Sequence, residues 1–333
     1  MQSLITWPRR LLRKAARLAG RLGLPGFRGR VEAQVSYRDY YSIAIYEGGS
    51  PLDLQPAAGV VNPVLKGSDV TDIAAIYVAD PFMIRHGGMW HMFFEILPEE
   101  VEKGVIGLAS SEDGRKWSYR QVVLEEEFHL SYPYVFEFEG AHYMVPESHQ
   151  DSSVRLYKAV DFPTRWEHVG NLLEGEEFVD CSPFHFQGRW WLFAGCGSLP
   201  YRADMLRLFH AEQLAGPWME HPQSPLISGD ARIARPGGRV VAWGDRLFRF
   251  TQDCHPRYGL RVRAFDIHEL TVESYRESPA AEEPILREVP GAKGWNSSGM
   301  HHLDPHLMED GSCRACVDGW YWGEIIPKAA KGD

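Results

Sequence analysis

The same alternation of apolar and polar positions returns about every fifty residues along this chain. Each copy opens with an acidic or polar residue near a proline, alternates through a glycine-containing turn, and resumes with aromatic residues. Clear copies span residues 80–95, 132–147, 180–194 and 235–250, and a weaker copy spans residues 301–311. Alternation with a period of two predicts β-strands, and the central glycine predicts a hairpin turn.

The spacing of the copies predicts the architecture. The prolines that anchor the clear copies, Pro81, Pro133, Pro183 and Pro236, are 52, 50 and 53 residues apart. Each opening hairpin is followed by a second alternating stretch and a Trp, as at residues 105–117. Four short strands per repeat of this length are typical of a propeller blade. We therefore predict an all-β, five-bladed β-propeller over residues 36–330, closed by residues 41–46 pairing with the last blade.

Residues 1–35 are predicted to form a separate basic, amphipathic arm or short helix. The first 30 residues carry eight Arg and Lys and no acid, with leucine and alanine at helical spacing between them. Such a helix can bind an anionic membrane surface through residues 9–30, and a solvated tail or a short capping helix is the alternative. Because the apolar stretch is interrupted by charge, it does not resemble a secretion signal. We expect a cytoplasmic protein that is peripheral at the inner membrane if the arm binds there.

Charge argues against one class of partner. Outside the first 30 residues, 27 basic residues stand against 45 acidic ones, a net charge of −18. Nucleic acid is therefore not expected as the main ligand, because phosphate binding needs a basic face. Aromatic residues make up 12% of the chain. Their rings suit packing across strands, which is the commoner use, and stacking on sugars.

Six acidic residues stand at or near matching points of the repeats. Because the first strand of a propeller blade faces the central channel, we expect them to gather around one funnel. They are Asp80, Glu95, Glu147, Asp180, Asp253 and Asp304. Glycosyl chemistry requires such carboxylates, one ionised at the reacting centre and one protonated for the leaving oxygen. The alternative for each residue is capping a turn or accepting backbone N–H groups.

Other polar residues near the same points offer groups that bind hydroxyls or a phosphate. They are Tyr134, Arg235, Gln252, His301 and His302. By contrast, His86, His91 and His142 are interpreted as strand-surface or packing residues.

Common cofactor motifs are missing from the sequence. There is no Walker motif, no GxGxxG after a strand, no GxSxG and no HExxH, so the usual kinds of nucleotide binding are unsupported. A metal site built from His301, His302 and Asp304 is the weaker alternative to our expectation of no metal and no cofactor.

Several short motifs resemble those of the N-terminal domain of glucosamine inositolphosphorylceramide transferase-like proteins. They lie at residues 78–82, 129–134, 144–148, 234–238, 252–254 and 299–302. The likeness runs from about residue 40 to residue 320 and implies a propeller associated with sugar transfer, which in the plant proteins accompanies a separate transferase domain.

The chain also resembles, in architecture, the five-bladed propeller glycosidases: arabinanases, β-xylosidases, invertases and levansucrases. This resemblance implies Asp80 as nucleophile or base, Glu147 as acid, and Asp180 as the residue that tunes the pKa of Glu147.

Three functions are consistent with these patterns. The first is a glycosyltransferase of cell-surface glycan assembly that moves a sugar from an activated, phosphorylated donor to a glycan acceptor in the central funnel. A furanosyl or phosphofuranosyl group is one candidate for that sugar. The alternatives are a glycoside hydrolase of the furanosidase or xylosidase propeller type and a noncatalytic carbohydrate-binding propeller.

Overall fold

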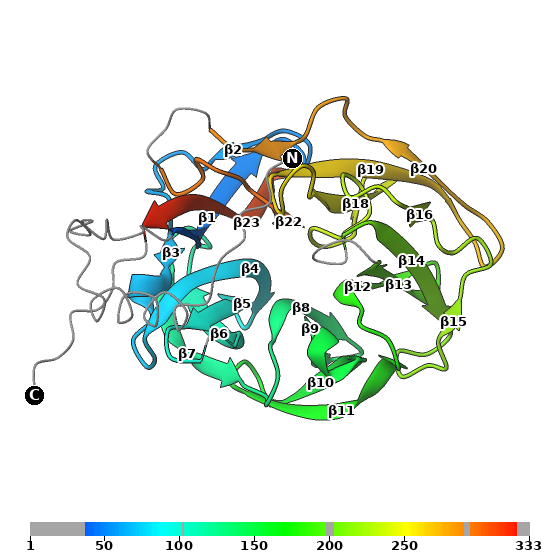
Figure 1. Ribbon diagram of the computed structural model, residues 1–333, viewed down its shortest axis with the longest axis horizontal. Coiled ribbons are helices and arrows are strands. Elements are labelled where there is room, and N and C mark those ends of the chain that lie inside the picture. Colours follow the sequence, from blue (N-terminus) through cyan, green and yellow to red (C-terminus); the bar gives the residue numbers. More distant parts are fainter. Residues whose placement is uncertain (1–36, 102, 198–202, 290–293, 325–333) are drawn as a thin grey trace, which may run out of the picture. The chain divides into compact units, whose positions relative to one another are not determined.

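The computed structural model describes residues 37–101, 103–197, 203–289 and 294–324, and its compact unit spans Arg38–Gly323. Within these residues the chain forms 23 strands and two short 3-10 turns, Gly67–Asp69 (η1) and His149–Asp151 (η2). The strands make five antiparallel sheets around a common centre (Figure 1). The prediction of an all-β, five-bladed propeller is confirmed, whereas the predicted arm at residues 1–35 lies outside the described residues. Across the described ranges, no helix has the length and apolar character needed to cross a membrane.

Blades 1 and 2 are regular four-stranded sheets whose strands follow the chain outward from the channel (Figure 1). Blade 1 consists of β4 (Ala75–His86), β5 (Met89–Pro98), β6 (Val105–Ser111) and β7 (Ser118–Leu124). Blade 2 consists of β8 (Ser131–Phe138), β9 (Ala141–Glu147), β10 (Ser153–Asp161) and β11 (Arg165–Glu174).

Blades 3 and 4 differ in their outer edge, where two short strands pair with the third strand instead of one long strand. Blade 3 consists of β12 (Val179–Phe186), β13 (Arg189–Cys196), β14 (Met205–Ala211), β15 (Met219–Glu220) and β16 (Ile227–Ser228). Blade 4 consists of β17 (Val241–Trp243), β18 (Arg246–Asp253), β19 (Arg261–Leu270), β20 (Tyr275–Pro279) and β21 (Leu286–Arg287).

Blade 5 closes the ring with strands from both ends of the described chain. It consists of β22 (Leu303–Leu307), β23 (Cys313–Glu324), β1 (Tyr37–Gly48), β2 (Leu54–Pro56) and β3 (Leu65–Lys66). Strand β1 lies between β23 and β2 in this sheet. The predicted pairing of residues 41–46 with the last blade is therefore confirmed.

The apolar core is divided among the spaces between neighbouring blades. Between blades 1 and 2, for example, Phe82 and Phe93 pack with Tyr134 and Met144. Burying one such side chain stabilises the fold by about 1.5–3 kcal/mol. Packing of this kind fixes each innermost strand against the next, and so fixes the side chains that those strands present to the channel.

A β-bulge interrupts the innermost strand of blades 1, 2 and 3 at the same point. The bulged residues Asp80, Tyr132 and Asp180 have φ angles of 51°, 45° and 49°. In each blade the bulged residue lies eight residues before the last residue of the hairpin turn, which is Gly88, Gly140 or Gly188. A non-glycine residue in this left-handed region costs about 1–3 kcal/mol, and such strain clusters at functional sites.

The bulges correct the alignment that the prolines suggested. Phe82, Tyr134 and Ser182 are equivalent, because they pair with Phe93, Val145 and Phe193. Cys181 therefore occupies the place of Pro81 and Pro133, and Pro183 lies two residues further along. The period of about fifty residues is right, but the proline of the third copy is not the structural equivalent of the other two.

Candidate active site

Two repeated positions supply most of the polar side chains of the site. The first is the bulge, which carries Asp80 in blade 1 and Asp180 in blade 3. The second lies six residues after the start of the second strand of a blade, where β5 has Glu95, β9 has Glu147 and β18 has Gln252. These positions explain why residues far apart in sequence lie at one level of the channel.

Blade 3 has Gly195 at the second repeated position. A Cβ there would come within 2.9 Å of Val179 Cγ2 and 3.1 Å of Pro236 Cδ. The glycine therefore lets the segment that contains Pro236 and Arg235 approach blade 3 closely.

One half of the site is organised around Arg235. Its Nε lies 2.5 Å from Asp180 Oδ2, and its Nη2 lies 3.1 Å from Glu147 Oε2. Gln252 donates from Nε2 to the same Asp180 oxygen at 2.6 Å. The Arg235 guanidinium carbon also lies 5.1 Å from the centre of the Tyr258 ring. All four polar side chains are buried, so a fixed cation lies between two carboxylates.

The other half is organised around His301. Its Nδ1 lies 2.7 Å from Asp318 Oδ1, and its Nε2 lies 3.6 Å from Asp80 Oδ1. The backbone N–H of Asp80 donates to Asp318 Oδ2 at 3.0 Å. Among the described residues, the buried Oδ1 of Asp80 has no hydrogen-bond partner. Asp80 therefore presents an unsatisfied acceptor oxygen beside an imidazole that a second carboxylate holds in place.

Glu95 and Glu147 have different neighbours although they occupy equivalent positions. Tyr77 Oη donates to Glu95 Oε1 at 3.4 Å, and His129 Nε2 lies 3.5 Å from the same oxygen. Glu147 has the Arg235 contact and a closer histidine, with His149 Nδ1 2.7 Å from Oε1. Glu147 is thus paired with a cation, whereas Glu95 has only long contacts.

These environments separate the pKa values of the three carboxyl groups. Burial raises the pKa of Asp80 to about 7, with His301 opposing the shift and Asp318 adding to it. Burial also raises the pKa of Glu95 well above its usual value, reinforced by Asp80 and Glu147. Burial would raise the pKa of Glu147 too, but His149 and Arg235 hold it below its usual range.

The arginine and histidine of the site are both cations at neutral pH. Burial alone would lower the pKa of His301, but Asp318 outweighs it and raises that pKa to about 9. Burial raises the pKa of Asp180, and the Arg235 guanidinium opposes that shift. The site therefore contains a Glu147 whose ionised form is favoured, a Glu95 whose protonated form is favoured, and an Asp80 whose pKa is about 7. Separated pKa values of this kind allow one group to act as acid and another as base.

The structure brings together seven of the residues that the sequence singled out, namely Asp80, Glu95, Glu147, Asp180, Arg235, Gln252 and His301. His302 is fully buried nearby, with Nδ1 3.9 Å from Asp80 Oδ1 and its ring 4.6 Å from that of Phe82. Burial lowers the pKa of His302 to about 4, so its ring is neutral.

Three other predicted residues belong to separate networks. Asp304 pairs with Arg239, with 2.5 Å between Oδ1 and Nε, and the Arg239 guanidinium carbon lies 4.9 Å from the centre of the Tyr134 ring. Asp253 pairs with Arg263 at 2.9 Å and accepts the backbone N–H of His255.

Sequence reasoning missed Asp318, Tyr77, Tyr258, His129 and His149. Asp318 is the most important omission, because it holds both His301 and the Asp80 backbone. The donor atoms of Asp80, His301 and Asp318 lie within 4.8 Å of one another. The weaker metal hypothesis grouped His301 with His302 and Asp304 instead. Asp304 lies outside this set because it accepts from Arg239, His306 and the Met83 backbone.

Comparison with known proteins relates most of the chain to one family. Residues 34–320 match the family described as glucosamine inositolphosphorylceramide transferase 1, N-terminal. Curated proteins named glucosamine inositolphosphorylceramide transferase 1 are 35% identical over 298 residues in Oryza sativa subsp. japonica and 33% identical over 299 residues in Arabidopsis thaliana. Each match covers 84% of this chain, which spans only 40% and 39% of the length of these relatives.

Solved structures share the fold at low sequence identity. An α-L-arabinanase of Cellvibrio cellulosa, in complex with arabinohexaose, is 14% identical with a TM-score of 0.53, covering 73% of this chain and 91% of its own. A β-1,2-mannobiose phosphorylase from Listeria innocua is 12% identical with a TM-score of 0.60, covering 82% of this chain and 96% of its own. At such identities the likeness shows the propeller fold alone.

Proposed function

Because the chain belongs to the glucosamine inositolphosphorylceramide transferase 1, N-terminal, family, we propose that it transfers a sugar from an activated, phosphorylated donor to a glycan acceptor in cell-surface glycan assembly. The observation that carries this proposal is the buried cluster in the channel. Asp80, with a pKa of about 7 and an unpartnered buried Oδ1 in the described part of the chain, lies beside the imidazolium of His301.

Asp80 is the base in this proposal. Its ionised carboxylate takes the proton of an acceptor hydroxyl, and the hydroxyl oxygen then forms the new bond to the anomeric carbon of the donor. The bond to the donor phosphate breaks, and the phosphate leaves with the electron pair. A base whose pKa lies near the working pH combines a useful ionised fraction with a useful proton affinity. His301, held by Asp318, keeps the Asp80 side chain in position.

Glu95 is the proton donor in this proposal. Its raised pKa favours the protonated carboxyl, which can donate a hydrogen bond to the leaving oxygen. The glycosidase resemblance implied Glu147 for this role. We assign the role to Glu95 instead, because Arg235 and His149 favour the ionised form of Glu147. Glu147 and Asp180 then serve to hold Arg235 in the channel.

The names of the relatives suggest the first substrates to test. A nucleotide-linked glucosamine sugar is the first donor, and an inositol phosphate glycolipid is the first acceptor. A furanosyl or phosphofuranosyl donor is the next candidate. We further propose a cytoplasmic protein whose basic residues 9–30 bring it to the anionic membrane surface that carries such an acceptor.

Hydrolysis is the second candidate, and one specific observation favours it. Glu95 and Glu147 occupy equivalent positions in neighbouring blades, with pKa values shifted in opposite directions. A carboxyl group that favours its protonated form beside one that favours its ionised form also suits a glycosidase, in which water takes the place of the acceptor.

A combined binding and product assay tests these functions. The purified full chain is screened by thermal shift against sugar nucleotides, phosphoribosyl pyrophosphate and neutral oligosaccharides, because a ligand of the native state raises the melting temperature. Mass spectrometry then follows the acceptor in each mixture. Stabilisation by a phosphorylated donor together with a sugar-sized gain in acceptor mass supports transfer. Stabilisation by neutral glycans with release of free sugar supports hydrolysis, and binding without any product supports a carbohydrate-binding module.

A further inference from the structure

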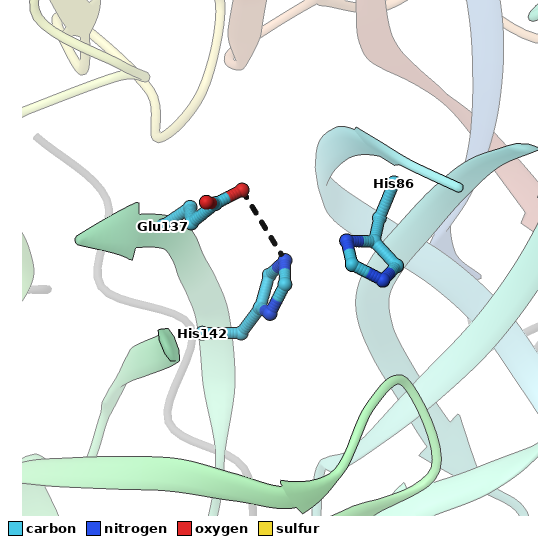
Figure 2. Close-up of side chains that lie close together, drawn as sticks. All are labelled: His86, Glu137 and His142. Carbon is cyan, nitrogen blue, oxygen red and sulfur yellow. Dashed lines mark ion pairs between the residues drawn. The ribbon is translucent and has the colours of Figure 1, made fainter. Parts of the chain in front are cut away.

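A second group of possible ligands lies away from the central site, near the hairpin turns of blades 1 and 2. His86 is six residues beyond Asp80 on β4, which corresponds to about 20 Å along an extended strand. Figure 2 shows that His86, Glu137 and His142 turn their side chains toward one another. One donor atom from each of these residues lies within 4.8 Å of the other two.

The geometry of this group is set by His142. Its Nε2 lies 3.7 Å from Glu137 Oε2, and its ring centre lies 4.7 Å from that of His86 with the rings perpendicular. The Phe162 ring stacks on the His142 ring with 3.8 Å between the ring centres, and this contact restricts the orientation of His142. Figure 2 shows the imidazole of His142 directed into the space between Glu137 and His86.

The Nε2 atom of His142 is a buried polar atom for which the described residues provide no hydrogen bond. His142 is 7% exposed, so water reaches its ring poorly. Leaving such an atom unsatisfied costs about 1–3 kcal/mol, which is why native structures rarely keep one without a purpose. The atom therefore points to a ligand that binds between the two blades.

The equivalent positions in neighbouring blades show that packing does not require a histidine here. Strand pairing matches Glu137 and His142 of blade 2 with Arg85 and Trp90 of blade 1, and with His185 and Trp190 of blade 3. Trp90 and Trp190 are buried and fill this space with an apolar ring. Of these three blades, only blade 2 has a side chain that can bind a metal ion at the tryptophan position, namely His142, and its strand partner there is the carboxylate Glu137.

We propose that His86, Glu137 and His142 bind a divalent transition metal ion of the zinc type, with water completing a tetrahedral shell. Two imidazoles and one carboxylate are suitable ligands for Zn²⁺, whereas Mg²⁺ and Ca²⁺ prefer shells of oxygen. Zinc bonds of about 2.0–2.2 Å require the donor atoms to lie about 3.3 Å apart. His86 and Glu137 are exposed and can turn toward the fixed ring of His142. The ion links blade 1, through His86, to blade 2, through Glu137 and His142.

Zinc titration of the full chain tests this proposal. The purified protein is treated with a chelator and titrated with Zn²⁺ in a calorimeter, with Co²⁺ absorption as a report on tetrahedral nitrogen and oxygen ligands. We expect one ion per chain, and a loss of affinity of about tenfold or more in His86→Gln and in Glu137→Gln, since each removes one of three ligands. Both substitutions lie at exposed positions, so the fold is retained.

Two controls make the outcome decisive. His185→Gln changes an exposed histidine at the position equivalent to Glu137, and it should bind Zn²⁺ as the wild type does. Asp80→Asn removes a donor from the central group and should also leave the affinity unchanged. Absence of Zn²⁺ binding by the wild type, equal binding by His86→Gln and Glu137→Gln, or loss of binding in Asp80→Asn would each overturn the proposal.

Discussion

Two buried carboxylates, Asp80 and Asp304, differ in how many of their oxygens are hydrogen-bonded. Both oxygens of Asp304 have partners, whereas Oδ1 of Asp80 has none among the described residues. Asp304 Oδ1 contacts Arg239 Nε at 2.5 Å, and its Oδ2 accepts the Met83 backbone N–H at 2.7 Å and faces His306 Nε2 at 2.9 Å. Arg239 also donates to the carbonyl of Val135 at 2.9 Å. Met83 belongs to blade 1, Val135 to blade 2 and Asp304 to blade 5, and Arg239 lies just before the first strand of blade 4. The Asp304 network therefore connects four blades and stabilises the closed ring.

Asp80 has a backbone contact to Asp318 and a distant imidazole, but its Oδ1 is unsatisfied by any described residue. The difference appears in the pKa values. Arg239 and His306 overcome burial and hold the pKa of Asp304 below its usual range, whereas burial raises the pKa of Asp80 to about 7. The comparison teaches that a fully paired buried carboxylate stabilises the fold, whereas an underpaired one retains the capacity to exchange a proton.

Asp80→Asn tests the chemical side of this comparison most strongly. The substitution keeps the shape of the side chain but removes the base, so we expect the rate of sugar transfer to fall by about 10²–10⁴-fold. The melting temperature should not fall, because no satisfied hydrogen bond of Oδ1 is lost. Steady-state kinetics with the donor identified by the screen measures the effect, and Asp245→Asn on an exposed turn is the control. An unchanged rate would make Asp80 a structural residue.

Asp304→Asn tests the structural side. It leaves the largely buried guanidinium of Arg239, whose side chain is 16% exposed, without its counterion, so we expect the free energy of unfolding to fall by about 3 kcal/mol. Urea unfolding measures this change. Glu309→Gln is the matched control, because it breaks an exposed ion pair with Arg85 and should cost less than about 1 kcal/mol. Equal stability of the two variants would show that the Asp304 network does not fasten the blades.

The pH dependence of stability should separate the two carboxylates further. The pKa of Asp80 is about 7 in the folded protein, above its ordinary value of 3.8, so folding favours the protonated form. Its stabilising contribution is complete below about pH 4 and is lost as the pH rises through about 7, on the order of 4 kcal/mol in total. Unfolding of wild type and Asp80→Asn across this range should give diverging curves. Parallel curves would mean that the pKa of Asp80 is ordinary.

Tyr132→Phe gives the smallest expected effect. Tyr132 is the bulge residue of blade 2, and its hydroxyl accepts the Gly238 backbone N–H at 2.7 Å and lies 2.9 Å from Ser182 Oγ. Removing it leaves the Gly238 N–H buried, so we expect a loss of about 2 kcal/mol in unfolding free energy. Tyr143→Phe, on the half-exposed face of β9, should change that energy by less than about 0.5 kcal/mol. Equal changes in the two variants would argue against the proposed role of this hydroxyl.

The repeat in the sequence was sufficient to predict the blades and half of the site. Period-two alternation and turn glycines determine which residues share a strand face, so Asp80, Glu95, Glu147 and Asp180 could be assigned to the channel. Strand alternation does not predict how far along the channel axis a residue lies. Asp304 stands on an innermost strand, as predicted, yet it faces Arg239 and not the residues around Asp80.

The fifth copy explains the main omission. Its hairpin turn spans residues 308–312 and is longer than the two-residue turns of blades 1 to 3, so the spacing that identified Glu95 and Glu147 does not extend to Asp318. Cys313 and Cys316 lie three residues apart on β23. Alternation along a strand directs them to opposite faces, where they pack into different clusters.

The closing blade has a consequence for the timing of synthesis. The backbone of Asp80 binds Asp318, 238 residues further along the chain, and His301 also comes from the last part of the ring. A ribosome must therefore release nearly the whole propeller before the two halves of the site can meet. Nascent chains that contain only blades 1 to 4 carry Asp80 without His301 and Asp318, so the proposed base acquires its partners only after the ring has closed.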